Sequence, residues 1–276
     1  MDFHNINLCV FDMDEKAVVK HIVDWLSDYL TKSGLDGFVV GVSGGVDSAV
    51  TSTLCALTGK PVLCLDMPIH QESNQLMRSA KHMDWLKQHF SNVEGKKIDL
   101  TAVYDTFAET VGADASSETT NLALANTRSR LRMTTLYQFA AEQRKLVAGT
   151  GNKVEDFGIG FYTKYGDGGV DLSPIADLMK SDVYALASYL NVIDEIIQAP
   201  PTDGLWDDDR TDEQQIGASY DEMEWAMKQV ESGKKPNDFS GKEKKLVEIY
   251  LHHHLKNKHK MIPIPVCFLP SLKKNT

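Results

Sequence analysis

Short apolar runs alternate with amphipathic helical segments through the first 150 residues of the chain. Continuous apolar character is typical of strands that are buried in a parallel sheet. Because alternating strands and helices pack as a sheet with helices on its faces, we predict an α/β fold with a doubly wound, mainly parallel sheet. The predicted strands are residues 38–42, 61–66, 97–100 (the weakest) and 145–149, and the predicted helices are residues 12–33, 47–58, 71–90 and 119–143.

The second half of the chain adds two loops and further helices. Residues 156–176 carry five glycines among aspartates and aromatic side chains, which indicates an ordered loop close to a ligand. Residues 200–215 indicate a mobile acidic loop, and long loops often act as lids. With helices predicted at residues 181–190, 219–231 and 241–256, we expect residues 1–276 to form a single domain with C-terminal helices.

Charge and cysteine content exclude several classes of protein. The chain has 29 Lys+Arg against 39 Asp+Glu, a formal net charge of −10, whereas nucleic-acid binding needs a basic face. The scattered cysteines lack the spacing of a zinc site and indicate a reducing compartment. The sequence has no signal-peptide pattern and no apolar run of about 18 residues, so we expect no membrane partner, no nucleic-acid partner and a cytoplasmic location.

The segment Ser43-Gly44-Gly45-Val46-Asp47-Ser48 joins a predicted buried strand to a helix. Its glycines let the backbone approach a ligand, and the helix N-terminus offers N–H groups to phosphate. The lysine of a Walker A loop and a G-x-G-x-x-G pattern are both missing, so this predicts a phosphate-binding loop of another kind. Asp47 beside a polyphosphate predicts a Mg²⁺ ligand; the alternative is that Asp47 only caps the helix.

This hexapeptide resembles the pyrophosphate loop of the N-type ATP pyrophosphatases, which split ATP into AMP and pyrophosphate while adenylating a substrate. Further motifs are similar to those of NAD synthetases, and they follow the family's order between residues 41 and 260. The most specific is the run Phe-Tyr-Thr-Lys-Tyr-Gly-Asp-Gly-Gly-Val-Asp at residues 161–171. The others are Asn126–Met133, Gly149–Glu155, Pro201-Thr202 and His259-Lys260.

The resemblance to ammonia-dependent, single-domain NAD synthetases implies an adenine-nucleotide alpha-hydrolase-like fold and a homodimer with the substrate partly across its interface. It implies catalytic roles for Asp47, Lys180 and Asp171, and Mg²⁺ held by Asp47 and Glu155. The implied contacts with ATP are Gly41, Val42, Ser43, Gly44, Gly45, Val46, Asp47, Ser48, Thr150, Lys180 and Thr202. The implied contacts with deamido-NAD, whose nicotinate carboxylate becomes an amide, are Arg130, Lys164, Asp171, His259 and Lys260.

The implied reaction is the ATP-dependent amidation of deamido-NAD to NAD, with release of AMP and pyrophosphate. The loop begins about 40 residues into the chain, which leaves no room for a preceding glutaminase domain, so we expect free ammonia as the nitrogen donor. Gly151-Asn152-Lys153 is more similar to the glutamine-dependent branch, and a separate glutaminase chain is therefore an alternative. A non-catalytic ATP-binding sensor of the same fold is another. GMP synthetases and tRNA-thiolating or tRNA-lysidine enzymes share the loop, but net charge and cysteine spacing disfavour the tRNA enzymes.

Two further groups of side chains have open interpretations. Arg128 and Arg132 share one face of the predicted helix, where they either contact an anion or are solvated. Consecutive histidines on a helix diverge, so His252, His253 and His254 are expected on a solvated surface and not at a metal.

Overall fold

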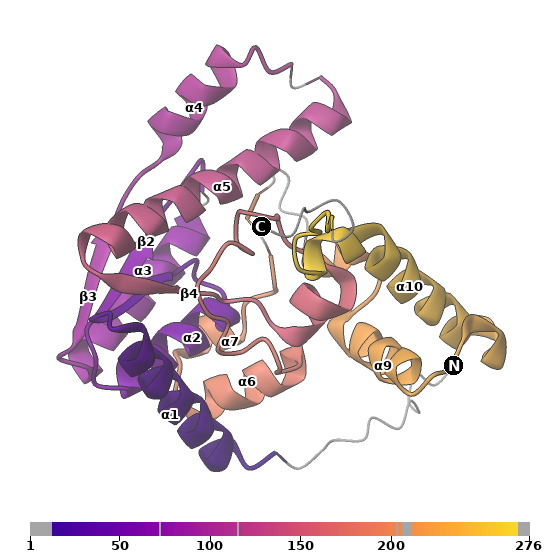
Figure 1. Ribbon diagram of the computed structural model, residues 1–276, viewed down its shortest axis with the longest axis horizontal. Helices are drawn as coiled ribbons and strands as arrows, with labels where there is room; N and C mark the ends of the chain where they lie inside the picture. Colours follow the sequence, from indigo (N-terminus) through magenta and orange to yellow (C-terminus); the bar gives the residue numbers. More distant parts are fainter. Residues whose placement is uncertain (1–12, 72, 115, 203, 206–210, 270–276) are drawn as a thin grey trace.

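The computed structural model describes residues 13–71, 73–114, 116–202, 204–205 and 211–269 (Figure 1). Within these residues, four parallel strands form one sheet in the order β3-β2-β1-β4. The strands are β1 (Gly37–Gly41), β2 (Val62–Asp66), β3 (Val93–Lys97) and β4 (Lys145–Ala148). The helices are α1 (Glu15–Ser33), α2 (Val46–Leu57), α3 (Ser73–His89), α4 (Thr101–Thr110), α5 (Glu118–Glu142), the π-helix η1 (Val154–Ile159), α6 (Lys180–Tyr189), α7 (Asp194–Ile197), α8 (Asp212–Ile216), α9 (Tyr220–Glu231), the 3₁₀ helix η2 (Pro236–Asp238) and α10 (Gly241–Met261).

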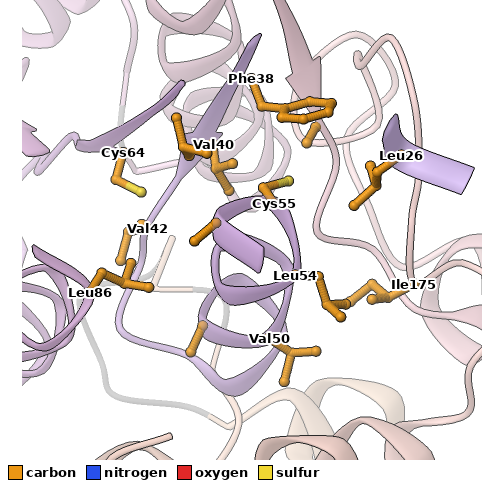
Figure 2. Packing of buried hydrophobic residues seen from close by; sticks show 14 of the residues in the cluster. Leu26, Phe38, Val40, Val42, Val50, Leu54, Cys55, Cys64, Leu86 and Ile175 are labelled. Carbon is orange, nitrogen blue, oxygen red and sulfur yellow. The ribbon is translucent and has the colours of Figure 1, made fainter. Parts of the chain in front are cut away.

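Helices cover both faces of this sheet, which confirms the predicted fold class. Successive strand residues point to opposite faces, so Phe38 and Val40 enter one buried cluster while Val39 enters another. The first cluster includes side chains of α1, α2, α3 and α6, and Figure 2 shows Cys55 of α2 close to Phe38 and Val40 of β1, with Leu54 of α2 beside Ile175. The second cluster is covered by α4 and α5, which lie along the top of Figure 1.

The C-terminal helices α9 and α10 pack on the π-helix η1, away from the sheet (Figure 1). Ile159 of η1, Met223 of α9 and Val247 of α10 are completely buried in this third cluster. The cluster therefore fixes η1 between the C-terminal helices and the loops that leave the sheet. Within the described part of the chain, no helix is long and apolar enough to cross a membrane.

Most predicted elements are confirmed to within a few residues, but the prediction was wrong in several segments. The third strand is Val93–Lys97 and not residues 97–100, because an edge strand is paired on one side and can carry polar side chains such as Glu94. Helix α4 was not predicted, and the two predicted loops contain η1 and α8. The lid interpretation of residues 203–215 is not tested, because residues 203 and 206–210 of that segment lie outside the described residues.

Strands β1 and β4 are hydrogen-bonded neighbours in the sheet. The loops that follow Gly41 and Ala148 therefore leave the sheet at the same edge, the carboxyl end, where α/β sheets bind ligands. The glycine turn after β1 and the turn after β4 line one cleft there.

The buried His82 makes the stability of the fold depend on pH. Its Nε2 lies 3.0 Å from Ser52 Oγ between α3 and α2, and its side chain is fully buried. Burial lowers the pKa of His82 to about 4, because the interior penalises the imidazolium. The folded state thus favours the neutral ring. Its stabilisation is complete above the unfolded-state pKa of about 6.5 and is lost as the pH falls towards 4.

We expect this group to lower the free energy of unfolding by up to roughly 3 kcal/mol between pH 7 and pH 4. His82→Gln keeps a hydrogen-bonding partner for Ser52 but cannot gain a charge, so its loss over the same range should be smaller. Urea unfolding at both pH values measures the difference. An equal loss in the wild type and the variant would show that His82 does not contribute.

Candidate active site

The loop between β1 and α2 forms one wall of a cleft at the carboxyl edge of the sheet. Gly44 has a φ of 81°, a left-handed conformation that favours glycine, and its backbone lies close to α3. The hydroxyl of Ser48 donates to Gly45 O at 2.9 Å and accepts from Ser43 N at 3.2 Å. These bonds hold the loop against the N-terminus of α2, whose first-turn N–H groups are suited to phosphate.

Asp47 does not cap α2, so the alternative interpretation of this residue as a helix cap is wrong. The N-cap residue of α2 is Gly45, which makes no side-chain cap bond. Asp47 Oδ1 accepts from Asn152 Nδ2 at 3.0 Å, and its Oδ2 accepts from Lys180 Nζ at 2.6 Å. The carboxylate therefore points away from its own helix and into a network built from distant parts of the chain.

Lys180 stands at the centre of this network. Its Nζ donates to Asp47 Oδ2 and, at 3.0 Å, to Glu155 Oε1, and only 3% of the residue is exposed. Burial acts to lower the pKa of Lys180, but the two carboxylates outweigh it and raise that pKa, so the ammonium stays charged. Burial raises the pKa of Glu155, and Lys180 opposes that shift. Three elements, α2, η1 and α6, thus meet at one buried ion-pair cluster.

Tyr220 at the start of α9 encloses the cluster from the side of the C-terminal helices. Its hydroxyl lies 2.6 Å from Glu155 Oε1 and 3.2 Å from Asp212 Oδ2, and its ring centroid lies 4.6 Å from Lys180 Nζ. Burial, followed by the charges of Glu155 and Asp212, raises the pKa of Tyr220, so the phenol stays neutral and can donate. Sequence reasoning missed Tyr220 and Asp212, because neither belongs to a motif identified from the sequence.

The cleft has a volume of about 260 Å³ and brings together residues that are far apart in the sequence. Every residue predicted to contact ATP lines it, and Glu155 lines it as well. These residues are Gly41, Val42, Ser43, Gly44, Gly45, Val46, Asp47, Ser48, Thr150, Lys180 and Thr202.

Comparison with known proteins identifies the family of the chain. The family model described as NAD synthase matches residues 18–263. The chain belongs to the NAD synthase family.

Relatives and solved structures agree with this assignment. An NH3-dependent NAD+ synthetase of Pyrobaculum aerophilum is 38% identical over 91% of this chain and 92% of the relative. One of Methanosarcina acetivorans is 37% identical over 80% of this chain and 84% of the relative. The structure of an NMN synthetase from Francisella tularensis is similar with a TM-score of 0.80 and 30% identity, covering 95% of this chain and 100% of that one.

A second group of NAD synthase motif residues gathers beside the cleft, where the loop after η1 meets α5 and α10. Lys164 Nζ donates to His259 O at 2.8 Å, and Arg130 donates to Lys164 O at 3.4 Å. Lys260 Nζ donates to Tyr162 O at 2.6 Å. The structure therefore brings together four of the five residues predicted to contact deamido-NAD. Their cationic groups bond to neutral carbonyl oxygens, which leaves positive charge suited to an anionic substrate.

Asp171, the fifth of these residues, lies apart from this group and does not line the cleft. Its Oδ2 accepts from Val147 N at 2.8 Å and its Oδ1 accepts from Tyr137 OH at 3.0 Å. In this chain Asp171 ties the end of β4 to α5. Its role towards substrate stays a prediction.

The two arginines with open interpretations are not solvated. Arg128 is 5% exposed and donates to Leu205 O at 3.0 Å. Arg132 lines the cleft and donates to Met67 O at 3.0 Å and to Gln71 Oε1 at 2.8 Å. They hold the segments around Leu205 and Met67 against α5, at the cleft.

The prediction of a solvated surface was also wrong for two of the three consecutive histidines. The Nε2 of His253 lies 3.0 Å from Ile216 O, and the Nδ1 of His254 lies 2.7 Å from Gly158 O. Both side chains are half-buried because α10 packs on η1 and α8, whereas His252 is exposed. They tie α10 to its neighbours.

Asn152 belongs to the motif Gly149–Glu155, but the sequence analysis predicted no role for it. It is completely buried, donates to Asp47 Oδ1 and accepts from Glu155 N at 3.1 Å. One amide therefore holds the carboxylate of Asp47 and the backbone of Glu155, the two predicted metal ligands. Its position between Gly151 and Glu155 in a recognised motif was the available signal.

Asp47 and Glu155 fit a magnesium ion by their chemistry. Both carboxylates line the cleft and both point an oxygen at the same ammonium, so their oxygens already converge on a cation. Among the described residues, no cluster of three or more Asp, Glu, His or Cys side chains forms a cage for a metal. Magnesium usually takes one or two carboxylates and completes its shell with water and phosphate oxygens, so a pair of carboxylates beside a phosphate loop suffices.

Proposed function

We propose that the protein is a ligase that converts deamido-NAD, ATP and ammonia to NAD, AMP and pyrophosphate. The observation that carries the proposal is the buried cluster of Asp47, Lys180 and Glu155 on the wall of a cleft that also contains the phosphate loop. The family membership and the names of the relatives support the same reaction.

The chain's own residues account for the chemistry in two steps. Backbone N–H groups in the first turn of α2 bind the phosphates of ATP, and Lys180 neutralises charge that develops on the α-phosphate. The nicotinate carboxylate attacks the α-phosphorus, which forms an acyl adenylate and releases pyrophosphate. Ammonia then attacks the acyl carbon, AMP leaves with its bonding electrons, and a proton is lost from nitrogen. When bound by Asp47 and Glu155, Mg²⁺ supplies charge neutralisation for the phosphates.

Electrostatics explains why an acidic protein can bind an anionic dinucleotide. The predicted substrate residues Arg130, Lys164 and Lys260 lie around one loop and carry positive charge. We propose that this group receives deamido-NAD, with its reactive carboxylate directed towards the cleft. We also propose a homodimer, which the resemblance to the family implies, and a single catalytic domain over residues 1–276 and a cytoplasmic location, as expected from the sequence.

A second candidate substrate is nicotinate mononucleotide, which would be amidated to NMN. The similarity to an NMN synthetase over 95% of this chain favours its inclusion. Both substrates carry the same nicotinate carboxylate, so the chemistry would be identical. Only the contacts with the adenylate half of deamido-NAD would distinguish them.

Purified protein with ATP, Mg²⁺, ammonium and deamido-NAD is expected to form NAD and AMP in equal amounts, quantified by chromatography. We expect kcat/KM for deamido-NAD to exceed that for nicotinate mononucleotide by about tenfold or more, because the second half of the dinucleotide adds contacts. Glutamine should not replace ammonium. A preference for nicotinate mononucleotide would change the substrate, and activity with glutamine alone would overturn the nitrogen donor. Failure to release AMP with either substrate would favour a sensor.

A further inference from the structure

We propose that Lys180 is the resident counter-ion of the magnesium site and that it exchanges with Mg²⁺ when the nucleotide binds. In the exchange, its ammonium leaves Asp47 and Glu155 and moves to the phosphates. This proposal rests on the proposed function in one respect, which is that the nucleotide is ATP. The exchange itself concerns three side chains whose contacts the structure gives.

The contacts place a single cation on both metal ligands. Lys180 Nζ is within 3.0 Å of one oxygen of each carboxylate, and the exposed fractions of the three side chains are 4%, 17% and 16% for Lys180, Asp47 and Glu155. A second cation at the same oxygens would be repelled across a short, poorly screened distance. Lysine and magnesium therefore compete for these two carboxylates.

The charge balance favours exchange only when ATP is present. Two carboxylates and one ammonium leave a net charge of −1, and an ammonium displaced without a new partner would be a buried, uncompensated charge. Phosphate oxygens in the cleft provide that partner, because Lys180 and the phosphate loop line the same cleft. Mg²⁺ and ATP should therefore bind with positive coupling, each increasing the affinity for the other.

Separate hydrogen bonds hold both carboxylates in place after the lysine leaves. Asn152 Nδ2 donates to Asp47 Oδ1, which is not the oxygen that Lys180 contacts. The Tyr220 hydroxyl lies 2.6 Å from Glu155 Oε1, the oxygen that Lys180 also contacts, so this bond stays when the lysine leaves. The ligand pair is thus anchored independently of Lys180, which allows one cation to replace another without rebuilding the site.

The test measures Mn²⁺ binding to nucleotide-free protein by the electron paramagnetic resonance signal of free Mn²⁺. The wild type should bind Mn²⁺ weakly, and Lys180→Met should bind it roughly tenfold or more tightly, because the competing charge is gone. Lys153→Met is the matched control. Lys153 pairs with Asp177 at 3.2 Å outside the cleft, so its loss should leave Mn²⁺ affinity unchanged. Added ATP should increase Mn²⁺ affinity far more in the wild type than in Lys180→Met.

Equal Mn²⁺ affinity in the wild type and Lys180→Met would overturn the exchange, as would tight Mn²⁺ binding by the wild type without ATP. Circular dichroism checks that Lys180→Met folds, and Lys180→Gln is used if Lys180→Met does not. The Mn²⁺ measurements on the wild type, with and without ATP, test the proposal without any variant. None of these measurements uses turnover. If the protein forms no NAD but shows the change in Mn²⁺ affinity, the exchange is supported and the proposed substrate is wrong. If it forms NAD without the change in Mn²⁺ affinity, the proposed function is supported and the exchange is wrong.

Discussion

The Asp47→Asn protein is expected to lose roughly 10²–10³-fold in kcat/KM for NAD formation while remaining folded. Each oxygen of Asp47 accepts from a donor, Asn152 Nδ2 at one and Lys180 Nζ at the other. In asparagine an NH₂ group replaces one of the two oxygens. Because NH₂ cannot accept a hydrogen bond, the contact with either Asn152 or Lys180 is lost. The substitution also removes half of the negative charge that the proposed magnesium site offers.

The matched control is Asp36→Asn, in which the same chemical change is made at the surface. Asp36 accepts from Arg144 at 3.1 Å with 61% of its side chain exposed, and exposed ion pairs contribute little. Both variants are assayed for NAD, for pyrophosphate and for thermal unfolding. A normal kcat/KM in Asp47→Asn would remove Asp47 from the catalytic machinery. A loss of activity in Asp36→Asn as well would show that the effect is general.

The sheet and the phosphate loop could be predicted because their signals are local. Phe38-Val39-Val40 is buried on both faces and therefore apolar throughout, and the Gly44-Gly45 turn follows it directly. At the edge of the same sheet the signal disappears. Residues 93–97 have a partner on one side only, so Glu94 and Lys97 are compatible with the strand, and the more apolar Ile98 and Leu100 misled the prediction.

The contacts within the site could not be predicted, because they depend on how distant segments pack. The family resemblance predicted that Lys180 contacts ATP and that Asp47 and Glu155 bind magnesium. It did not predict that Lys180 forms ion pairs with both carboxylates. Tyr220 reaches Glu155 only because α9 packs on η1, which places a phenol from one segment beside a carboxylate from another. Helix α4 was missed for a related reason: of its apolar side chains, Val103 and Phe107 are exposed while Tyr104 is buried, so its apolar face is weakly marked.

Replacing Gly44 by alanine is expected to lower the affinity for ATP by roughly tenfold to a hundredfold, or about 1.4 to 3 kcal/mol of binding free energy. Two effects combine at this position. Its φ of 81° is strained for any residue with a Cβ, at a cost of about 1–2 kcal/mol. The added Cβ would also lie 2.9 Å from Gln75 O and 3.0 Å from Ser79 N, which belong to the backbone of α3.

Gly59→Ala separates these two effects. Gly59 has a φ of 70°, but its added Cβ would meet nothing within 4 Å. Thermal unfolding should therefore show only the cost of the positive φ in Gly59→Ala, and at least that loss of stability in Gly44→Ala. Only Gly44→Ala should bind ATP weakly in calorimetry. The backbone of α3 cannot move aside as a flexible side chain can, so the loop itself must shift and displace the N–H groups that bind phosphate. Wild-type ATP affinity in Gly44→Ala would mean that the loop tolerates displacement and that the phosphates are held mainly by side chains such as Lys180.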